Sequence, residues 1–188
     1  MTRVPLRELD GAEPGTVAAF RSFERENRAP IDLYRALANA PGLLNGFHEL
    51  SDALRYRGRV PRLLRELAIL RTAYLTGSEY EWSHHVGMAL AAGIEQPQVA
   101  GIGRWPDSSA FGAVERAVLR LADEMHAGQV SDATFTAVAA ATSTEEATEL
   151  VVLLGHYQGV ARIIQALGVQ TEPAYAAAAS WHRMESPR

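Results

Sequence analysis

Apolar side chains recur along the chain at the three- and four-residue spacing of amphipathic helices, and no segment shows the strict alternation of a strand. Prolines and glycines separate these periodic segments, so the predicted connections are short. Helices are predicted over residues 16–26, 31–39, 43–56, 62–75, 79–92, 98–102, 111–127, 132–140 and 144–167, and the Ala-rich segment 171–188 is predicted to be helical in part. The pattern predicts an all-α, single-domain helical bundle.

Local signals mark the ends of the two helices that we expect at the centre of the bundle. Pro61 suits the first turn of helix 62–75, and Gly77 ends it. Ser78 is the predicted cap of the following helix, 79–92. Because the connection is so short, the two helices are expected to form an antiparallel pair.

The most apolar stretch, 151–169, is interrupted by polar side chains and by a charged one, Arg162. A membrane span needs about 20 nearly uncharged residues, so we interpret this stretch as a buried helix of a soluble protein. Residues 1–11 mix charges of both signs without an apolar run, which is unlike a secretory signal. We therefore expect a cytoplasmic protein. The last helix is apolar around much of its circumference, so it lies either at the centre of the protomer or against a second subunit.

Composition excludes several classes of chemistry in this chain of 188 residues. Lys+Arg 18 against Asp+Glu 22 gives a net charge of −4, so no nucleic-acid or membrane partner is expected. Cysteine is absent, which removes disulfides, thiolate metal sites and cysteine nucleophiles. Lysine is absent as well, which excludes Schiff-base enzymes.

Candidate chemistry lies in the central helix pair. Glu66 stands inside an otherwise apolar helix, and Glu81 and His85 follow at i,i+4 spacing on one face of the next. A carboxylate beside an imidazole orients it and raises its basicity, which suits proton transfer near neutral pH. A structural role is the alternative, because Ser78 and Glu81 have the spacing of a capping box.

The stretch from Arg65 to Gly93, RELAILRTAYLTGSEYEWSHHVGMALAAG, resembles the core of the carboxymuconolactone decarboxylase family, which includes the alkylhydroperoxidase D proteins. The segment 149–168 is similar to the family's C-terminal helix. The resemblance implies an alkylhydroperoxidase D-like bundle over 41–170, an N-terminal helical extension over 1–40 and a C-terminal tail over 171–188. It also implies a homo-oligomer, a trimer or a hexamer.

This sequence departs from the peroxidase pattern at the redox residues. The family's two cysteines fall on Ser78 and Glu81, and the histidine between them falls on Tyr80. The peroxidase role therefore does not transfer. In this helix the decarboxylase branch of the family has the pattern Glu-x-x-x-His, and Glu81 and His85 are similar to it. Glu66 matches the glutamate that precedes this pattern in the family. The resemblance implies a cofactor-free lyase or isomerase that acts by proton transfer on a small carboxylated or lactone-like metabolite.

We expect Glu66, Glu81 and His85 to be catalytic, and Tyr80, Trp82 and Arg62 to bind the substrate. No cofactor and no metal is expected, although Glu81-x-x-His84 and Asp123-x-x-His126 have a spacing found in di-iron proteins. Two alternatives remain: a non-catalytic binding or scaffold member of the family, and a cysteine-independent peroxidase-like activity. Arginines that could attract an anionic substrate crowd the approach to the central helices, at positions 55, 57, 59, 62 and 65.

Overall fold

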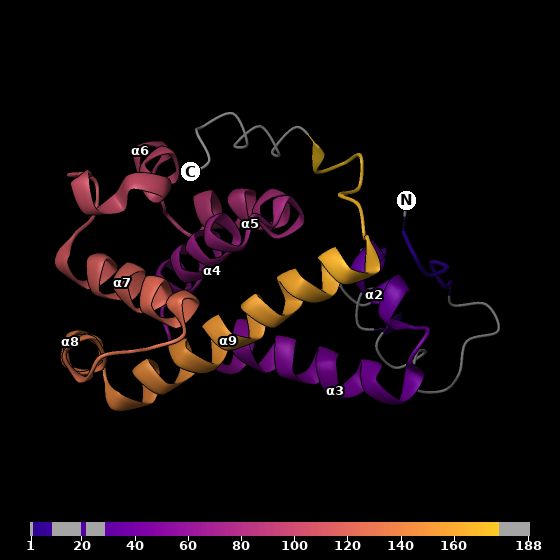
Figure 1. Ribbon diagram of the computed structural model, residues 1–188, viewed down its shortest axis with the longest axis horizontal. Helices are drawn as coiled ribbons and strands as arrows, with labels where there is room; N and C mark the ends of the chain where they lie inside the picture. Colours follow the sequence, from indigo (N-terminus) through magenta and orange to yellow (C-terminus); the bar gives the residue numbers. More distant parts are fainter. Residues whose placement is uncertain (1, 9–19, 22–28, 177–188) are drawn as a thin grey trace.

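All regular structure is helical in residues 2–8, 20–21 and 29–176, the part of the chain that the computed structural model describes (Figure 1). The predicted all-α class is confirmed. The predicted helix 16–26 lies outside the described residues except for Phe20 and Arg21. The elements are α2 (Asp32–Leu37), α3 (Pro41–Asp52), the π-helical turn η1 (Ala53–Arg57), α4 (Arg62–Thr76), α5 (Glu79–Ala91), α6 (Gln96–Gly101), the 3-10 turn η2 (Ile102–Asp107), α7 (Ala113–Ala127), α8 (Asp132–Ala141) and α9 (Thr144–Leu167).

Helix α4 is the central element of the bundle and packs against α5, α7 and α9. Its apolar positions face two sides. Ala68 and Ile69 belong to the core shared with α7, α8 and α9, whereas Leu67 and Leu70 belong to the core shared with α5 and η2. A helix enclosed in this way leaves little room for polar side chains, so a glutamate within it needs a specific partner.

The turn between α4 and α5 follows the local sequence signals. Gly77 adopts a left-handed conformation, φ 64°, and ends α4. The next residue, Ser78, caps α5, because its hydroxyl oxygen accepts a hydrogen bond from the backbone N–H of Glu81. This tight turn folds α5 back along α4 and brings the polar residues of the two helices together.

Helix α9 runs along the long axis of the molecule in Figure 1 and, by length and composition alone, could span a membrane. Its residues Leu150, Leu154 and Ala161 are buried, and it packs against α4, α7 and α8. In this structure α9 is a core helix of the bundle.

The predicted helix 43–56 is divided in two in the structure. It begins earlier, with Pro41 in the first turn of α3, and after Asp52 it becomes the π-helical turn η1. The chain then bends at Gly58, where an added Cβ would lie 2.7 Å from a carboxylate oxygen of Glu149. That carboxylate accepts hydrogen bonds from the backbone N–H groups of Arg59 and Val60, which fixes the end of η1 to α9.

Candidate active site

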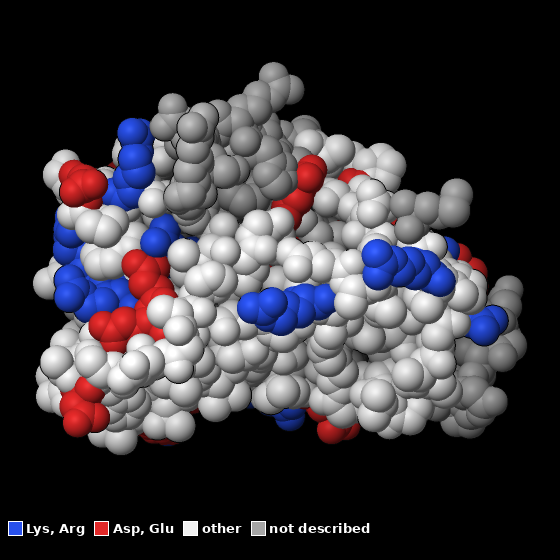
Figure 2. Space-filling view, viewed as in Figure 1, with Lys and Arg blue, Asp and Glu red and all other residues white. Residues whose placement is uncertain are grey.

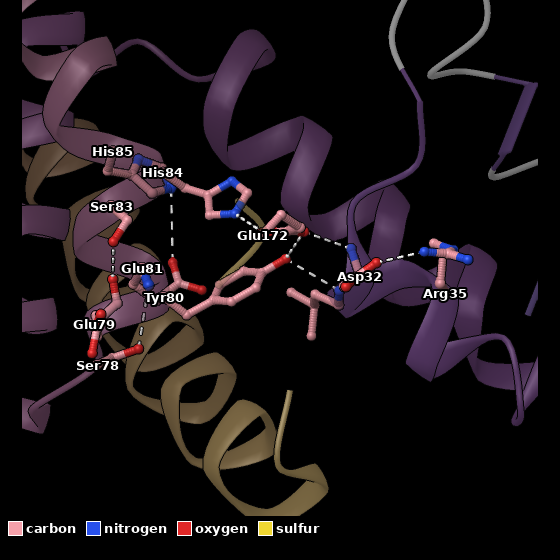
Figure 3. Close-up of polar contacts among 11 residues, drawn as sticks. Asp32, Arg35, Ser78, Glu79, Tyr80, Glu81, Ser83, His84, His85 and Glu172 are labelled. Atoms are coloured by element: carbon pink, nitrogen blue, oxygen red, sulfur yellow. Dashed lines mark hydrogen bonds and ion pairs between the residues drawn. The ribbon is translucent and has the colours of Figure 1, made fainter. Parts of the chain in front are cut away.

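The carboxyl groups of Glu66 and Glu81 flank the imidazole of His85, one at each ring nitrogen. Glu66 on α4 lies with Oε2 2.8 Å from His85 Nδ1, at hydrogen-bonding distance. Glu81, one turn before His85 on α5, has Oε2 3.7 Å from Nε2 (Figure 3). All three side chains are buried. The structure thus brings together the three residues that the sequence predicts to be catalytic.

The Glu81 carboxyl group is not used to cap its own helix. Ser78 supplies the N-cap of α5 and its oxygen lies 3.4 Å from the Glu81 backbone nitrogen. A capping box would also turn the Glu81 side chain back to the backbone N–H of Ser78. That N–H instead donates to the carbonyl oxygen of Ala73, and the Glu81 side chain points toward His85. The carboxyl group is therefore available for chemistry.

Glu66 and His85 form a coupled buried pair. Burial works to raise the pKa of Glu66, but the hydrogen bond with His85 and the positive charges of Arg55 and Arg65 outweigh it and lower the pKa. Burial lowers the pKa of His85 against the opposing effect of Glu66. Near neutral pH, Glu66 is a carboxylate that accepts the Nδ1–H of a neutral imidazole. The Nε2 lone pair is left available as a base.

Glu81 has the opposite ionisation preference. Burial raises its pKa to about 8, and the positive charge of Arg55 only partly opposes this effect. At neutral pH the group is mostly a carboxylic acid. The site therefore holds a proton donor, Glu81, directly beside a proton acceptor, His85 Nε2, which is the arrangement that general acid–base catalysis requires.

Glu81 and His85 line a cavity of about 160 Å³ enclosed by α2, α3, η1, α5 and α9. Apolar walls come from residues such as Phe47 and Val160, and Arg55 supplies a positive charge. Glu66 does not line the cavity and lies behind His85. It can act on a ligand only through the imidazole.

The three predicted substrate-binding residues have different locations. Tyr80 is buried and lines the cavity. Trp82 is buried in the core between α4 and α5, and does not line the cavity. Arg62 is exposed at the first residue of α4, away from the cavity. On a helix, neighbours two positions apart point in different directions, so Tyr80 and Trp82 cannot face the same cavity.

Two further polar residues line the cavity, Ser51 and His156, and neither was among the predicted site residues. The Ser51 hydroxyl donates to the carbonyl oxygen of Phe47, so its oxygen accepts the Nε2–H of His156 at 3.0 Å. Burial lowers the pKa of His156 to about 4, which keeps this ring neutral. Ser51 and His156 are 105 residues apart. The sequence signals were a serine on the apolar face of α3 and a histidine within the apolar stretch 151–169.

Glu172, which follows α9, joins the cavity-lining residues Tyr80 and His84 to α2 through three hydrogen bonds (Figure 3). It accepts from the Tyr80 hydroxyl at 2.9 Å, from the backbone N–H of Asp32 at 2.7 Å, and from His84 Nε2 at 2.7 Å. The ring of Tyr175 stacks on His84 at 3.8 Å between centroids and also lines the cavity. The segment after α9 is thereby joined to α2 and α5.

The second carboxylate-x-x-His motif takes part in packing. Asp123 pairs with the Arg71 guanidinium at 2.6 Å and accepts a hydrogen bond from the Trp105 indole at 2.8 Å. Within the described ranges, no group of three or more histidine, aspartate or glutamate side chains is arranged to hold a metal ion.

The protein is thus an all-α bundle whose central pair of antiparallel helices, α4 and α5, carries a buried acid–base site. The sequence model of the carboxymuconolactone decarboxylase family matches residues 41–124. Residues 41–124 are therefore similar to this family, and the chain has no cysteine. No curated protein matches it significantly.

Solved structures show that the fold is alkylhydroperoxidase D-like. The apo structure of the debrominase Bmp8 has a TM-score of 0.78 at 21% identity and covers 94% of this chain and 95% of its own. An uncharacterised peroxidase-related protein from Ralstonia eutropha JMP134, described as an alkylhydroperoxidase core, has a TM-score of 0.78 at 17% identity. The match covers 93% of this chain and 94% of that protein. An uncharacterised peroxidase-related protein from Silicibacter sp. TM1040 has a TM-score of 0.78 at 15% identity, and the match covers 93% of each chain.

Proposed function

We propose that this protein is a cofactor-free lyase or isomerase that moves protons on a small carboxylated or lactone-like metabolite. One observation carries the proposal: His85 stands between two carboxyl groups of opposite ionisation preference, Glu66 and Glu81, in a cavity that fits a small molecule. The similarity of residues 41–124 to the carboxymuconolactone decarboxylase family supports the same class of reaction.

In an isomerisation, His85 Nε2 takes a proton from a carbon next to the substrate carbonyl. The electron pair left on carbon moves into the carbonyl, and the resulting enolate oxygen accepts a hydrogen bond from the Glu81 carboxylic acid. The Glu66 carboxylate stabilises the imidazolium formed at His85. The imidazolium then returns its proton to a different carbon, which restores the starting state of the site.

In a decarboxylation, the bond between carbon and the departing carboxylate breaks, carbon dioxide leaves, and the electron pair forms the same kind of enolate. Glu81 supplies the proton that carbon needs. His85 Nε2 then passes a proton from solvent back to Glu81, and the Glu66 carboxylate stabilises the imidazolium formed in this relay. The same three residues therefore serve both reactions, and the position of the carboxylate in the substrate decides between them.

The absence of cysteine argues against a thiol-based reaction. Two of the neighbouring structures are described as peroxidase-related, and one related structure is a cysteine-to-alanine variant of debrominase Bmp8 in complex with 2,3,4-tribromopyrrole. This chain has no cysteine. A cysteine-independent peroxidase-like activity and a non-catalytic binding role are the alternative functions that the experiment below must exclude.

The test is a screen of unsaturated lactones and β,γ-unsaturated acids in deuterated water, with deuterium incorporation and product identity followed by nuclear magnetic resonance. We expect turnover by the wild type, and losses of roughly 10²-fold or more in kcat for His85→Gln and Glu81→Gln. Glu66→Gln should lower kcat with little change in KM, because Glu66 does not reach the cavity.

Matched controls are His126→Gln and Glu49→Gln, which change the same residue types at exposed positions. They should keep the wild-type rate. Deuterium incorporation that persists unchanged in His85→Gln would refute the proposed chemistry, and peroxide consumption without added thiol would favour the peroxidase-like alternative.

The protein is further proposed to be a cytoplasmic homo-oligomer. Large apolar side chains exposed on α3, η1 and α9 support this assembly, among them Leu50, Tyr56 and Val152. The face viewed in Figure 2, which includes α9, is mostly uncharged across its middle apart from separate arginines.

A further inference from the structure

Arg55 enters the cavity from an unusual element of the fold. It lies in η1, the π-helical turn that continues α3, and it lines the cavity together with Glu81 and His85. Single π-helical turns are rare and are frequently found at functional sites. Here the turn directs a guanidinium group into the same space as the acid–base pair.

Within the described part of the chain, this guanidinium has no carboxylate within salt-bridge distance. Its Nη2 donates to the thioether sulfur of Met88 at 3.3 Å, and its Cζ lies 4.9 Å from the centre of the Tyr56 ring. A thioether is a weak acceptor, and an aromatic ring compensates a buried cation only in part. A neighbouring arginine is satisfied differently: Arg57 donates to the carbonyl oxygen of Glu49 on the outside of the bundle.

A second donor faces the cavity near Arg55. Tyr157 on α9 is buried, lines the cavity, and packs its ring edge-on against His85 at 5.1 Å between centroids. Among the described residues its hydroxyl has no hydrogen-bond partner. Its pKa is raised well above the ordinary value by burial, so the group stays protonated and can donate.

We propose that Arg55 and Tyr157 form a carboxylate-binding subsite, which holds a carboxylate of the ligand so that the adjacent carbon lies at His85. The guanidinium fork matches the two oxygens of a carboxylate, and the tyrosine adds a third hydrogen bond. A bound monoanion would balance the charge of Arg55. A phosphate would bring a second negative charge close to Glu66, which the buried site disfavours.

This subsite deepens the proposed function and depends on it for the identity of the reacting carbon, but the binding of an anion does not require turnover. It also separates two kinds of substrate. A lactone without a carboxylate leaves Arg55 without an acceptor at salt-bridge distance, so the carboxylated metabolite is the one that the cavity selects.

The test measures binding by isothermal titration with pairs of probes that differ only in charge: 2-furoate against 2-furamide, and benzoate against benzamide. We expect each acid to bind roughly tenfold or more tightly than its amide. Arg55→Gln should remove this preference, Arg55→Lys should retain part of it, and Tyr157→Phe should weaken acid binding several-fold. Arg57→Gln is the matched control and should bind as the wild type does.

Equal binding of acid and amide by the wild type, or an unchanged preference in Arg55→Gln, would overturn the subsite. Tighter binding of inorganic phosphate than of either acid would overturn the carboxylate assignment. Circular dichroism establishes that each variant is folded, and Arg55→Lys provides the comparison if Arg55→Gln does not fold. A protein that shows the preference without catalysing deuterium exchange would keep the subsite and refute the proposed function.

Discussion

The carboxyl groups of Glu66 and Glu81 lie on opposite sides of one imidazole and differ in their ionisation. Glu66 has a lowered pKa because a hydrogen bond from His85 and nearby positive charges overcome its burial, whereas burial raises the pKa of Glu81 to about 8. The difference arises from the elements that carry them: Glu66 meets the Nδ1–H donor and the charge of Arg65, whereas Glu81 is fully buried and only the charge of Arg55 opposes the effect of burial. Two chemically identical groups thereby become a fixed anion and a proton donor.

The pH dependence of activity should report Glu81. Catalysis needs Glu81 protonated and His85 neutral, so kcat/KM should fall as pH rises through about 8, and should also fall in acid as the imidazole becomes protonated. The charged group that faces Glu81 is Arg55 from η1, and the titratable group beside it on its own helix is the neutral imidazole of His85. In Glu81→Gln the residual activity should lose the alkaline limb. If kcat/KM of this variant still falls as pH rises through about 8, a group other than Glu81 causes the loss of activity in alkali.

The stability of the fold should also depend on Glu81. Its pKa in the folded protein is raised from the ordinary value of 4.5 to about 8, so the unfolded chain loses the proton first as pH rises. The contribution to the free energy of unfolding is fully present below pH 4.5 and is lost between there and about pH 8, by at most about 5 kcal/mol.

Urea unfolding at several pH values measures this effect. Glu81→Gln cannot ionise, so its free energy of unfolding should decline less over that range than that of the wild type, and the two curves should diverge steadily. Glu49→Gln, an exposed control, should follow the wild-type curve. Parallel curves for wild type and Glu81→Gln would mean that Glu81 ionises normally in the fold.

The sequence predicted much of this site because the relevant signals were local. The i,i+4 spacing put Glu81 and His85 on one face, and Gly77 with Ser78 predicted the turn that brings Glu66 to them. Arg55 could not be separated from the other arginines, because the π-helical turn after Asp52 shifts its side chains away from the positions that an α-helical repeat predicts.

Contacts between distant segments were beyond the reach of the sequence. Glu172 contacts Tyr80 and His84 only because α9 ends beside α5. The hydrophobic pattern of a sequence does not predict which element the segment after a helix will contact. The same limit applies to Ser51 and His156, whose hydrogen bond joins α3 to α9. Such contacts can be identified only once the tertiary structure is known.

Glu172 should stabilise the packing of the segment after α9 against α2 and α5. Burial works to raise its pKa, but hydrogen bonds from His84 and the backbone N–H of Asp32 outweigh it and lower the pKa to about 2. Its stabilising contribution is therefore present above about pH 4.5 and is lost as pH falls toward 2. We expect Glu172→Gln to lower the free energy of unfolding by about 1–3 kcal/mol at neutral pH.

The deficit of this variant should shrink in acid, where the wild-type carboxylate is protonated too. Thermal unfolding by circular dichroism at neutral and acidic pH measures both values, and Glu145→Gln serves as a control because its ion pair with Arg59 is exposed. A deficit that is the same at both pH values would show that Glu172 acts through packing and not through its charge.

Assembly provides the final prediction. An obligate interface buries on the order of 2,000 Å² of mostly apolar surface, and the protomer exposes large apolar side chains on neighbouring elements: Leu50 on α3, 43% exposed, and Val152 on α9, 45% exposed. At micromolar concentration, multi-angle light scattering should give the mass of an oligomer, which is at least twice the 20.4 kDa of one chain. Val152→Asp should shift the protein toward the monomer, because a buried unpaired charge is costly. Ala137→Asp on the exposed face of α8 should not. A wild-type protein that elutes as a monomer would contradict the proposed assembly and leave the cavity, which one chain encloses, as the whole of the site.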